Sequence, residues 1–242
     1  MMLRTAISGG VTRNSHARVV DELGKAIVGG IYSTGAVLPG DAELAERFDV
    51  SRTVLREAMK TLTAKGLVVP KARIGTRVTE RSTWNLFDGD VLIWHLESGI
   101  DPEFIGNLAE MRLSFEPFAA DLAAKRASST EISRLYACVE AMETADAMDS
   151  FAFADLDFHL TLLDISKNPF MFSVGSLIEA ALVTSFRLSS PYGEPRRQQA
   201  TSEAHRAIVD AIASGDGSKA ASAMQAVIID GRDRIAGEVA GS

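Results

Sequence analysis

The 242-residue chain has a single cysteine and no long apolar run. Cys138 cannot form a disulfide within the chain, and its apolar neighbours predict a buried, unreactive thiol. No apolar stretch approaches the roughly 18 residues that a membrane-spanning helix needs, and the first residues lack the apolar region of a signal peptide. These absences predict a cytoplasmic protein without a membrane partner.

The chain also lacks the short motifs that mark many enzymes. It contains no glycine-rich dinucleotide loop, no Walker loop and no nucleophile elbow. At 46% hydrophobic and 24% charged residues, the composition is that of an ordinary globular protein and excludes disordered, collagen-like and disulfide-rich classes.

The net charge of −7 is distributed unevenly along the chain. Residues 1–80 carry 12 Lys and Arg against 8 Asp and Glu, whereas the remaining 162 residues carry 13 against 24. The first third is therefore basic, at +4, and the rest is acidic, at −11. The acidic total argues against a nucleic-acid partner, but the distribution does not.

The basic third predicts three short helices followed by a β-hairpin. Only Asp49-Val50 separates the second helix from the third, and Asp41 and Ser51 are placed to cap these two helices. Strand-forming residues then flank a turn-like segment. The expected helices cover residues 16–27, 41–48 and 51 up to the stop signal Lys65-Gly66, and the expected strands cover 67–69 and 76–78.

Two helices joined by so short a turn are typical of a helix-turn-helix, in which the second helix enters the major groove of DNA. Arg52, Thr53 and Arg56 share the exposed N-terminal side of the third helix. Arginine can bond guanine O6 and N7, and threonine can reach a phosphate or a base. Residues 51–77 carry seven basic side chains and one acid, which favours DNA contact over a merely solvated face.

The hairpin adds a second group of candidate DNA-binding residues. Gly75 would let the backbone approach a phosphate or the minor groove, although the needs of a turn explain this glycine equally well. The neighbouring candidates are Lys71, Arg73 and Thr76.

Residues 29–78 resemble the winged helix-turn-helix of the GntR-type bacterial transcription regulators, most specifically in LPGDAELAERFDVSRTVLREAMKTL. The resemblance implies that Arg52, Thr53, Arg56 and the wing residues around Gly75 read an operator. Two departures stand out. Ala42 replaces a frequent arginine, and Arg73-Ile74-Gly75 replaces a wing that usually has two glycines.

Beyond residue 80 the apolar spacing is helical throughout, with polar or Gly/Pro breaks that predict an antiparallel bundle. The expected fold class is mainly α: an N-terminal winged helix-turn-helix of three helices plus a β-hairpin wing, then an all-α bundle. The expected divisions are a flexible tail at 1–11, a DNA-binding domain at 12–80, a connector helix at 81–100, and an effector-binding and dimerisation domain at 101–242.

The helical half contains a few polar residues at apolar positions. Asp155 and His159 lie four apart on one helical face, where they could share a metal ion or form an ordinary Asp–His pair. His205, on a later helix, could join them. Arg112 lies among apolar neighbours and could grip a carboxylate inside the bundle. Alternatively, it could pair with Glu110, Glu116 or Asp155.

Residues 101–242 resemble the ligand-sensing FCD domain of the FadR-like branch of these regulators. In that family one Asp and three His hold a divalent metal, commonly zinc or nickel, which helps to grip an effector carboxylate. The resemblance implies that Asp155, His159 and His205 are metal ligands and that Arg112 binds the effector. Val227 stands where the third histidine is expected.

The connector WNLFDGDVLIWHLESGIDP is similar to that of sugar-acid regulators, which also lack the third histidine. This similarity predicts a sugar-acid effector of the aldonate type. The apolar connector residues are expected to pack against the bundle. These residues are Trp84, Leu86, Val91, Leu92 and Trp94.

The resulting hypothesis is a homodimeric repressor, not an enzyme, that leaves its operator when a small carboxylate binds. The alternative is a metal-dependent enzyme that uses Asp155, His159 and His205, with the basic domain as a DNA-docking accessory. No spare general acid or base accompanies these three residues, which disfavours the enzyme.

Overall fold

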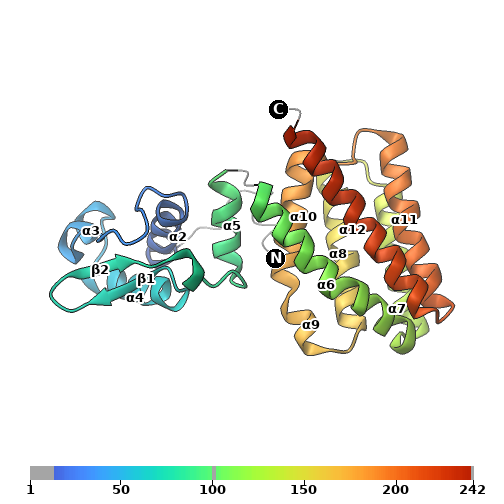
Figure 1. The fold of residues 1–242 in the computed structure, drawn as a ribbon, viewed down its shortest axis with the longest axis horizontal. Coiled ribbons are helices and arrows are strands. Elements are labelled where there is room, and N and C mark those ends of the chain that lie inside the picture. The colour runs from blue at the N-terminus through green and yellow to red at the C-terminus, as the bar shows by residue number, and fades with distance from the viewer. Residues whose placement is uncertain (1–13, 100–101, 241–242) are drawn as a thin grey trace. The chain divides into compact units, whose positions relative to one another are not determined.

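The computed structural model of the protein describes residues 14–99 and 102–240. These residues form two compact units, an N-terminal unit of residues 14–99 and a C-terminal unit of residues 102–240 (Figure 1). The predicted tail at 1–11 lies outside the described residues. None of the described helices is both long and apolar enough to cross a membrane.

The N-terminal unit contains the predicted helices and hairpin. Asn14 accepts a hydrogen bond from the Ala17 amide at 2.8 Å to begin α2, and Ser51 accepts one from the Val54 amide at 3.3 Å to begin α4. Asp41 does not cap its helix, because it is the first helical residue and Gly40 occupies the cap. The elements are α2 (Ser15–Val28), α3 (Asp41–Arg47), α4 (Arg52–Ala64), β1 (Val68–Lys71), β2 (Gly75–Val78), the 3-10 turn Arg81–Thr83 and α5 (Gly89–Glu97).

A glycine turn connects α4 to the hairpin. Gly66 has a φ of +80°, and a Cβ there would lie 2.1 Å from the Thr83 carbonyl oxygen, so a side chain does not fit. The strands β1 and β2 then pair antiparallel, with Val68 opposite Val78. Gly66 thus sets the direction in which the hairpin leaves α4.

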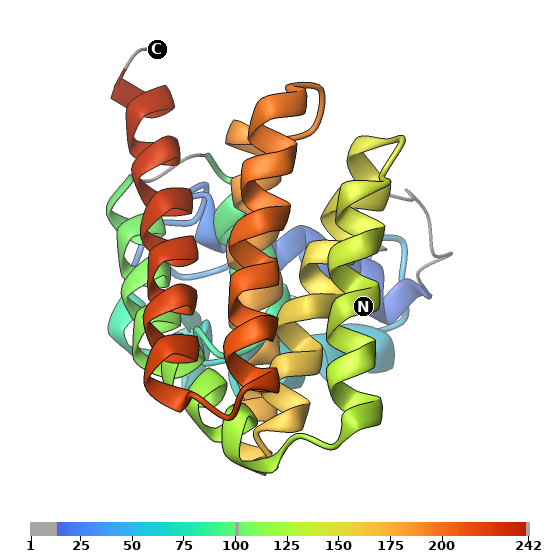
Figure 2. The same ribbon diagram turned by 90° about the vertical axis from the view of Figure 1, so that its right-hand side faces the viewer.

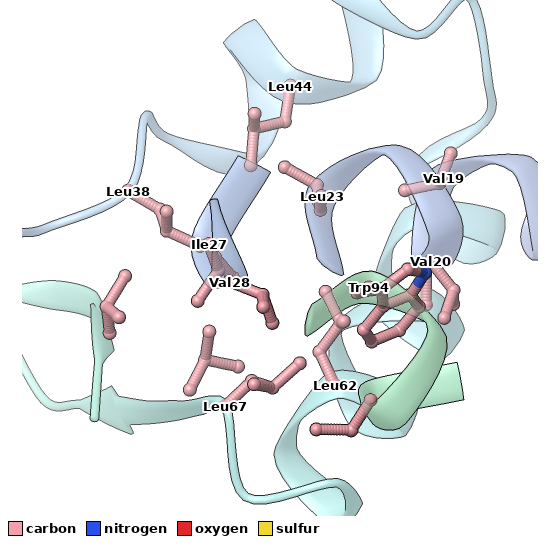
Figure 3. Close-up of a cluster of buried hydrophobic side chains, with 14 of the residues drawn as sticks. Val19, Val20, Leu23, Ile27, Val28, Leu38, Leu44, Leu62, Leu67 and Trp94 are labelled. Carbon is pink, nitrogen blue, oxygen red and sulfur yellow. The ribbon is translucent and has the colours of Figure 1, made fainter. Parts of the chain in front are cut away.

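The connector helix α5 packs into the core of the N-terminal unit (Figure 3). The Trp94 ring occupies the space where a Cβ on Gly24 would be, at 2.4 Å, and Trp94 Nε1 donates to Asp21 Oδ1 at 2.9 Å. Trp84 and Val91 belong to the same core cluster. The expectation that these three residues pack against the bundle was therefore wrong.

An ion pair joins α5 to the end of α4. Lys65 follows the last residue of α4, and its Nζ lies 2.6 Å from Asp88 Oδ1 and 2.8 Å from Asp90 Oδ2. The same Nζ lies 5.7 Å from the centre of the Trp94 ring. Although burial of Lys65 opposes its charge, the hydrogen bonds to Asp88 and Asp90 outweigh this effect and raise the pKa of its ammonium group.

The C-terminal unit is a helical bundle, so the predicted fold class is confirmed. The helix α12 packs along α6 and α11, while α8 packs against α6, α7 and α10 (Figure 2). The helices are α6 (Pro102–Arg126), α7 (Ser129–Glu143), α8 (Met148–Ile165), α9 (Pro169–Ser173), α10 (Gly175–Ser189), α11 (Pro195–Ala213) and α12 (Gly217–Ala240).

Cys138 lies on α7 and is half-buried, which is less burial than the sequence predicted. Desolvation by its surroundings raises the pKa of the Cys138 thiol. A raised pKa keeps the thiol protonated and therefore poorly nucleophilic, as expected for an unreactive cysteine.

Candidate functional site

The N-terminal end of α4 presents three predicted DNA-binding side chains. Arg52, Thr53 and Arg56 are exposed, while Leu55 is fully buried on the opposite side. Among the described residues, neither Arg52 nor Arg56 has a hydrogen-bond or ion-pair partner. Both guanidinium groups are therefore available to an external acceptor.

The hairpin presents the second predicted group. Lys71 and Gly75 face each other across the ladder, both exposed, and Thr76 is half-buried beside them. Arg73 lies in the turn with a φ of +64°, a left-handed conformation that costs a non-glycine residue about 1–2 kcal/mol. Gly75 has a φ of +109°. The backbone thus adopts glycine-type conformations at both positions, and one of them carries an arginine.

Three of the seven basic residues in 51–77 are engaged within the N-terminal unit. Lys65 pairs with Asp88 and Asp90, Lys60 pairs with Glu57 at 2.8 Å, and Arg77 Nε donates to the Gly35 carbonyl at 2.8 Å. The basic surface that remains without partners in the described parts of the chain consists of Arg52, Arg56, Lys71 and Arg73.

The C-terminal unit contains a cavity of about 370 Å³. This volume lies within the usual range of small-molecule pockets, about 300–1,000 Å³. Apolar side chains from α8 and α10 form part of its wall, and charged or polar side chains from four helices converge on it. The polar lining residues are Arg112, Asp155, His159, Arg197, Thr201, His205, Asp230 and Arg234.

The structure brings Asp155, His159 and His205 together at this cavity, as predicted. The two histidine Nε2 atoms are 3.4 Å apart, and Asp155 Oδ1 lies 3.1 Å from His205 Nε2. All three side chains are buried. Burial opposes ionisation of Asp155, but its hydrogen bond with His205 outweighs this effect and lowers the carboxyl pKa.

Arg112 joins the same group through Glu116. Arg112 Nε donates to Glu116 Oε1 at 2.5 Å, and Arg112 Nη2 lies 3.5 Å from His159 Nε2. Of the three pairing partners that the sequence left open, the structure selects Glu116, because Glu110 is exposed and makes no ion pair with Arg112. We call Arg112, Glu116, Asp155, His159 and His205 the polar cluster.

Glu116 is the member of the polar cluster that sequence reasoning did not place in the site. It is fully buried, and its Oε2 lies 2.5 Å from His159 Nδ1. Burial would raise its carboxyl pKa, but the charge of Arg112 outweighs burial and the pKa falls to about 2. The available signal was the four-residue spacing from Arg112, which only indicated a possible pair.

Two parts of the chain match models of known families. Residues 16–78 match the bacterial regulatory proteins of the gntR family, and residues 107–230 match the FCD domain. The chain belongs to the GntR family of transcription regulators. Its N-terminal unit therefore binds operator DNA, and its FCD domain binds a small-molecule effector.

Individual proteins agree with this assignment. The chain is 36% identical over 213 residues to the uncharacterised HTH-type regulator YieP of Escherichia coli, covering 87% of this chain and 90% of YieP. It is 35% identical over 227 residues to the E. coli galactonate operon transcriptional repressor, covering 93% and 98%. The solved structure of Lar from Listeria monocytogenes shares the fold, with a TM-score of 0.66, 20% identity and coverage of 94% and 99%.

The family assignment decides between the two functional classes that the sequence left open. The matching families and the relatives are DNA-binding regulators and not enzymes. The alternative of a metal-dependent enzyme that uses Asp155, His159 and His205 is therefore not retained.

Asp155, His159 and His205 have the donor atoms of a metal site. A carbonyl oxygen only accepts, so Thr201 O, 2.8 Å from His205 Nδ1, places a proton on that nitrogen. The negative charge of Glu116, 2.5 Å from His159 Nδ1, favours a proton on that nitrogen too. The Nε2 atoms of the two histidines face each other across 3.4 Å, and Asp155 Oδ1 lies 3.1 Å from His205 Nε2. Nitrogens bound tetrahedrally to zinc at about 2.0–2.1 Å have this separation, and a metal there would replace the contact between His205 Nε2 and Asp155. These residues therefore fit a divalent metal.

Proposed function

We propose that this GntR regulator is a homodimeric repressor of a sugar-acid catabolic operon, released from its operator by an aldonate-type carboxylate. The similarity to the galactonate operon repressor over nearly the whole length of both chains supports the sugar-acid class. The observation that carries the proposal is Arg112, a buried guanidinium at the wall of a cavity in an apolar bundle.

For the operator, we propose that Arg52, Thr53 and Arg56 read base edges in the major groove. Their exposure at the start of α4, together with the unpartnered guanidinium groups, supports this role. The wing residues then contact the backbone or the minor groove. A homodimer would place two recognition helices in successive major grooves of a two-fold symmetric site. The proposed wing residues are Lys71, Arg73, Gly75 and Thr76.

For the effector, we propose that Arg112 binds the carboxylate, beside Asp155, His159 and His205. Glu116 holds Arg112 Nε, and Arg112 Nη2 approaches His159 at the cavity. A guanidinium fixed in this way can meet both carboxylate oxygens. The effector changes operator affinity only if it binds the two conformational states unequally.

We also propose that Asp155, His159 and His205 hold a divalent metal, zinc or nickel. When bound, the metal supplies positive charge and an open coordination position for an effector oxygen. Val227 lines the cavity and provides no donor atom, so the protein contributes three ligands. We expect a metal affinity below that of a four-ligand site.

The test is a titration of galactonate and other aldonates into the protein–operator complex, followed by fluorescence anisotropy of labelled operator. The matched control is galactitol, which keeps the hydroxyl groups but lacks the carboxylate. We expect an aldonate to release the DNA and to raise the melting temperature of the free protein, and galactitol to do neither. Failure of every aldonate in both assays would overturn the sugar-acid assignment.

The metal is tested in the same assays with and without a chelator. Chelation should weaken the effector response, and Val227→His, which offers a fourth ligand at the cavity wall, should raise zinc affinity. If the wild-type protein responds to the effector equally with and without the chelator, a role for the metal is contradicted. Sedimentation of the full chain determines the oligomeric state.

A further inference from the structure

Glu116 is a buried carboxylate with two donors. On α6, its Oε1 accepts from Arg112 Nε at 2.5 Å, and its Oε2 lies 2.5 Å from His159 Nδ1. The side chain has no exposed surface. An isolated carboxylate would be costly in this position, so its two contacts account for its burial.

The Glu116 carboxylate lies 2.5 Å from His159 Nδ1 without the alignment of a hydrogen bond, and its negative charge favours a proton on this nearer nitrogen. A carboxylate accepts and does not donate, so it selects the tautomer with the proton on Nδ1. The unprotonated Nε2 then faces His205 Nε2 at 3.4 Å and Asp155 Oδ2 at 3.9 Å. Among the described residues, Glu116 is the carboxylate that lies against His159 Nδ1, so it keeps the lone pair on the cavity side.

The contact with Arg112 determines how that guanidinium is presented. Nε is bound at 2.5 Å, and Nη2 lies 3.4 Å from Glu116 Oε2 and 3.5 Å from His159 Nε2. Arg112 also lines the cavity. One carboxylate therefore fixes both the cation that would meet the effector and the imidazole that would meet the metal.

We propose that Glu116 is a positioning residue that prepares His159 to bind a metal and Arg112 to bind the effector carboxylate. The inference rests on the proposed function for the identity of the two ligands. It predicts that a change at Glu116 affects metal binding and effector binding together, although Glu116 itself need touch neither ligand.

The chemistry of the contacts requires a carboxylate and not an amide. Both partners of Glu116 donate, whereas a glutamine offers one acceptor oxygen and one donor NH₂ group. In Glu116→Gln, either the bond to Arg112 breaks or His159 must move its proton to Nε2. Glu116→Asp keeps the charge and both acceptors on a shorter side chain.

The first experiment measures tautomers in the metal-free, full-length protein with ¹⁵N-labelled histidine. The chain has only four histidines, and a His159→Gln variant assigns the resonance. We expect His159 to be protonated on Nδ1 alone in the wild type and this pattern to be lost in Glu116→Gln. A wild-type His159 that is protonated on Nε2 alone would overturn the proposal, whatever the variants do.

The second experiment measures zinc affinity by competition with a chromophoric chelator, and aldonate affinity by calorimetry. Glu116→Gln should weaken zinc binding about 10–100-fold and weaken aldonate binding as well, with partial recovery in Glu116→Asp. The matched control is Glu110→Gln, an exposed glutamate on the same helix, which should bind as the wild type does.

The two experiments separate this inference from the proposed function. If wild-type protein binds neither zinc nor aldonate while His159 shows the expected tautomer, the ligands named under the proposed function are wrong, while the placement of the His159 proton by Glu116 is supported. Unchanged zinc and aldonate affinities in folded Glu116→Gln, with folding checked by circular dichroism, would overturn the positioning role. If Glu116→Gln does not fold, the same criteria apply to Glu116→Asp and to the wild-type tautomer.

Discussion

The two candidate sites of this protein use arginine in opposite ways. Arg52 and Arg56 at the start of α4 are exposed and have no ion-pair partner among the described residues, whereas Arg112 is buried and bound to Glu116 at 2.5 Å. The first arrangement keeps the charge hydrated until phosphates or bases replace the water. The second has already been desolvated and oriented during folding. DNA binding should therefore depend on salt, and the exposed arginines should contribute little to the stability of the free protein. Substitution of the buried Arg112 should change both effector binding and the stability of the fold.

The largest expected effect on DNA binding is the loss of specific operator binding in Arg52→Ala and Arg56→Ala. An arginine bidentate to guanine contributes about 1–3 kcal/mol of discrimination, so each substitution should lower specific affinity roughly 10- to 100-fold. Anisotropy with specific and scrambled duplexes measures the loss. Melting temperature and effector affinity should stay at wild-type values, and unchanged operator affinity would refute the assignment of α4.

The largest expected effect on stability compares a buried arginine with an exposed one. Arg112→Ala leaves Glu116 buried without its main counter-charge, so the free energy of unfolding should fall by about 3–5 kcal/mol. Arg134, which lies 3.9 Å from Asp164 on the surface, is the matched control, and Arg134→Ala should cost about 0–1 kcal/mol. Urea unfolding measures both.

The same pair of variants tests the effector site. At a temperature where Arg112→Ala remains folded, it should bind operator but no longer release it with aldonate, whereas Arg134→Ala should respond normally. A normal response in folded Arg112→Ala would show that the effector binds elsewhere.

The smallest expected effect is on the salt dependence of binding. Operator affinity should fall steeply as salt rises, and Lys71→Ala should reduce the slope of log K against log [salt] by about 1 for each subunit bound. Aldonate affinity should change much less, because the polar cluster is buried and poorly screened. Equal slopes for the two ligands would contradict the contrast between the sites.

Local spacing was sufficient to predict the elements whose partners are near in sequence. The apolar stripe of α4, the Ser51 cap and the hairpin after Gly66 each depend on residues within a few positions. The resemblance to a known family supplied Arg112 and His205 as members of one site. Neither the local elements nor the residues supplied by the resemblance required knowledge of where side chains point.

Other features depend on contacts that spacing does not specify. The apolar pattern of α5 indicates a buried face but not the surface that covers it, and Trp94 packs against Gly24 in the N-terminal unit. The break between α7 and α8, at Thr144–Ala147, contains neither glycine nor proline, so the sequence carries no Gly/Pro signal for the end of α7. The contact of Glu116 with His159 joins residues that are 43 positions apart and on different helices.

The packing of Trp94 against α2 also defines where this protein can be divided. A DNA-binding fragment that ends after the hairpin, near residue 80, would remove the indole that fills the space beside Gly24 and would expose Leu23, Leu62 and their neighbours to water. Chimeric regulators that exchange sensor domains should therefore be joined after Glu97, so that α5 is inherited with the DNA-binding half and not with the sensor.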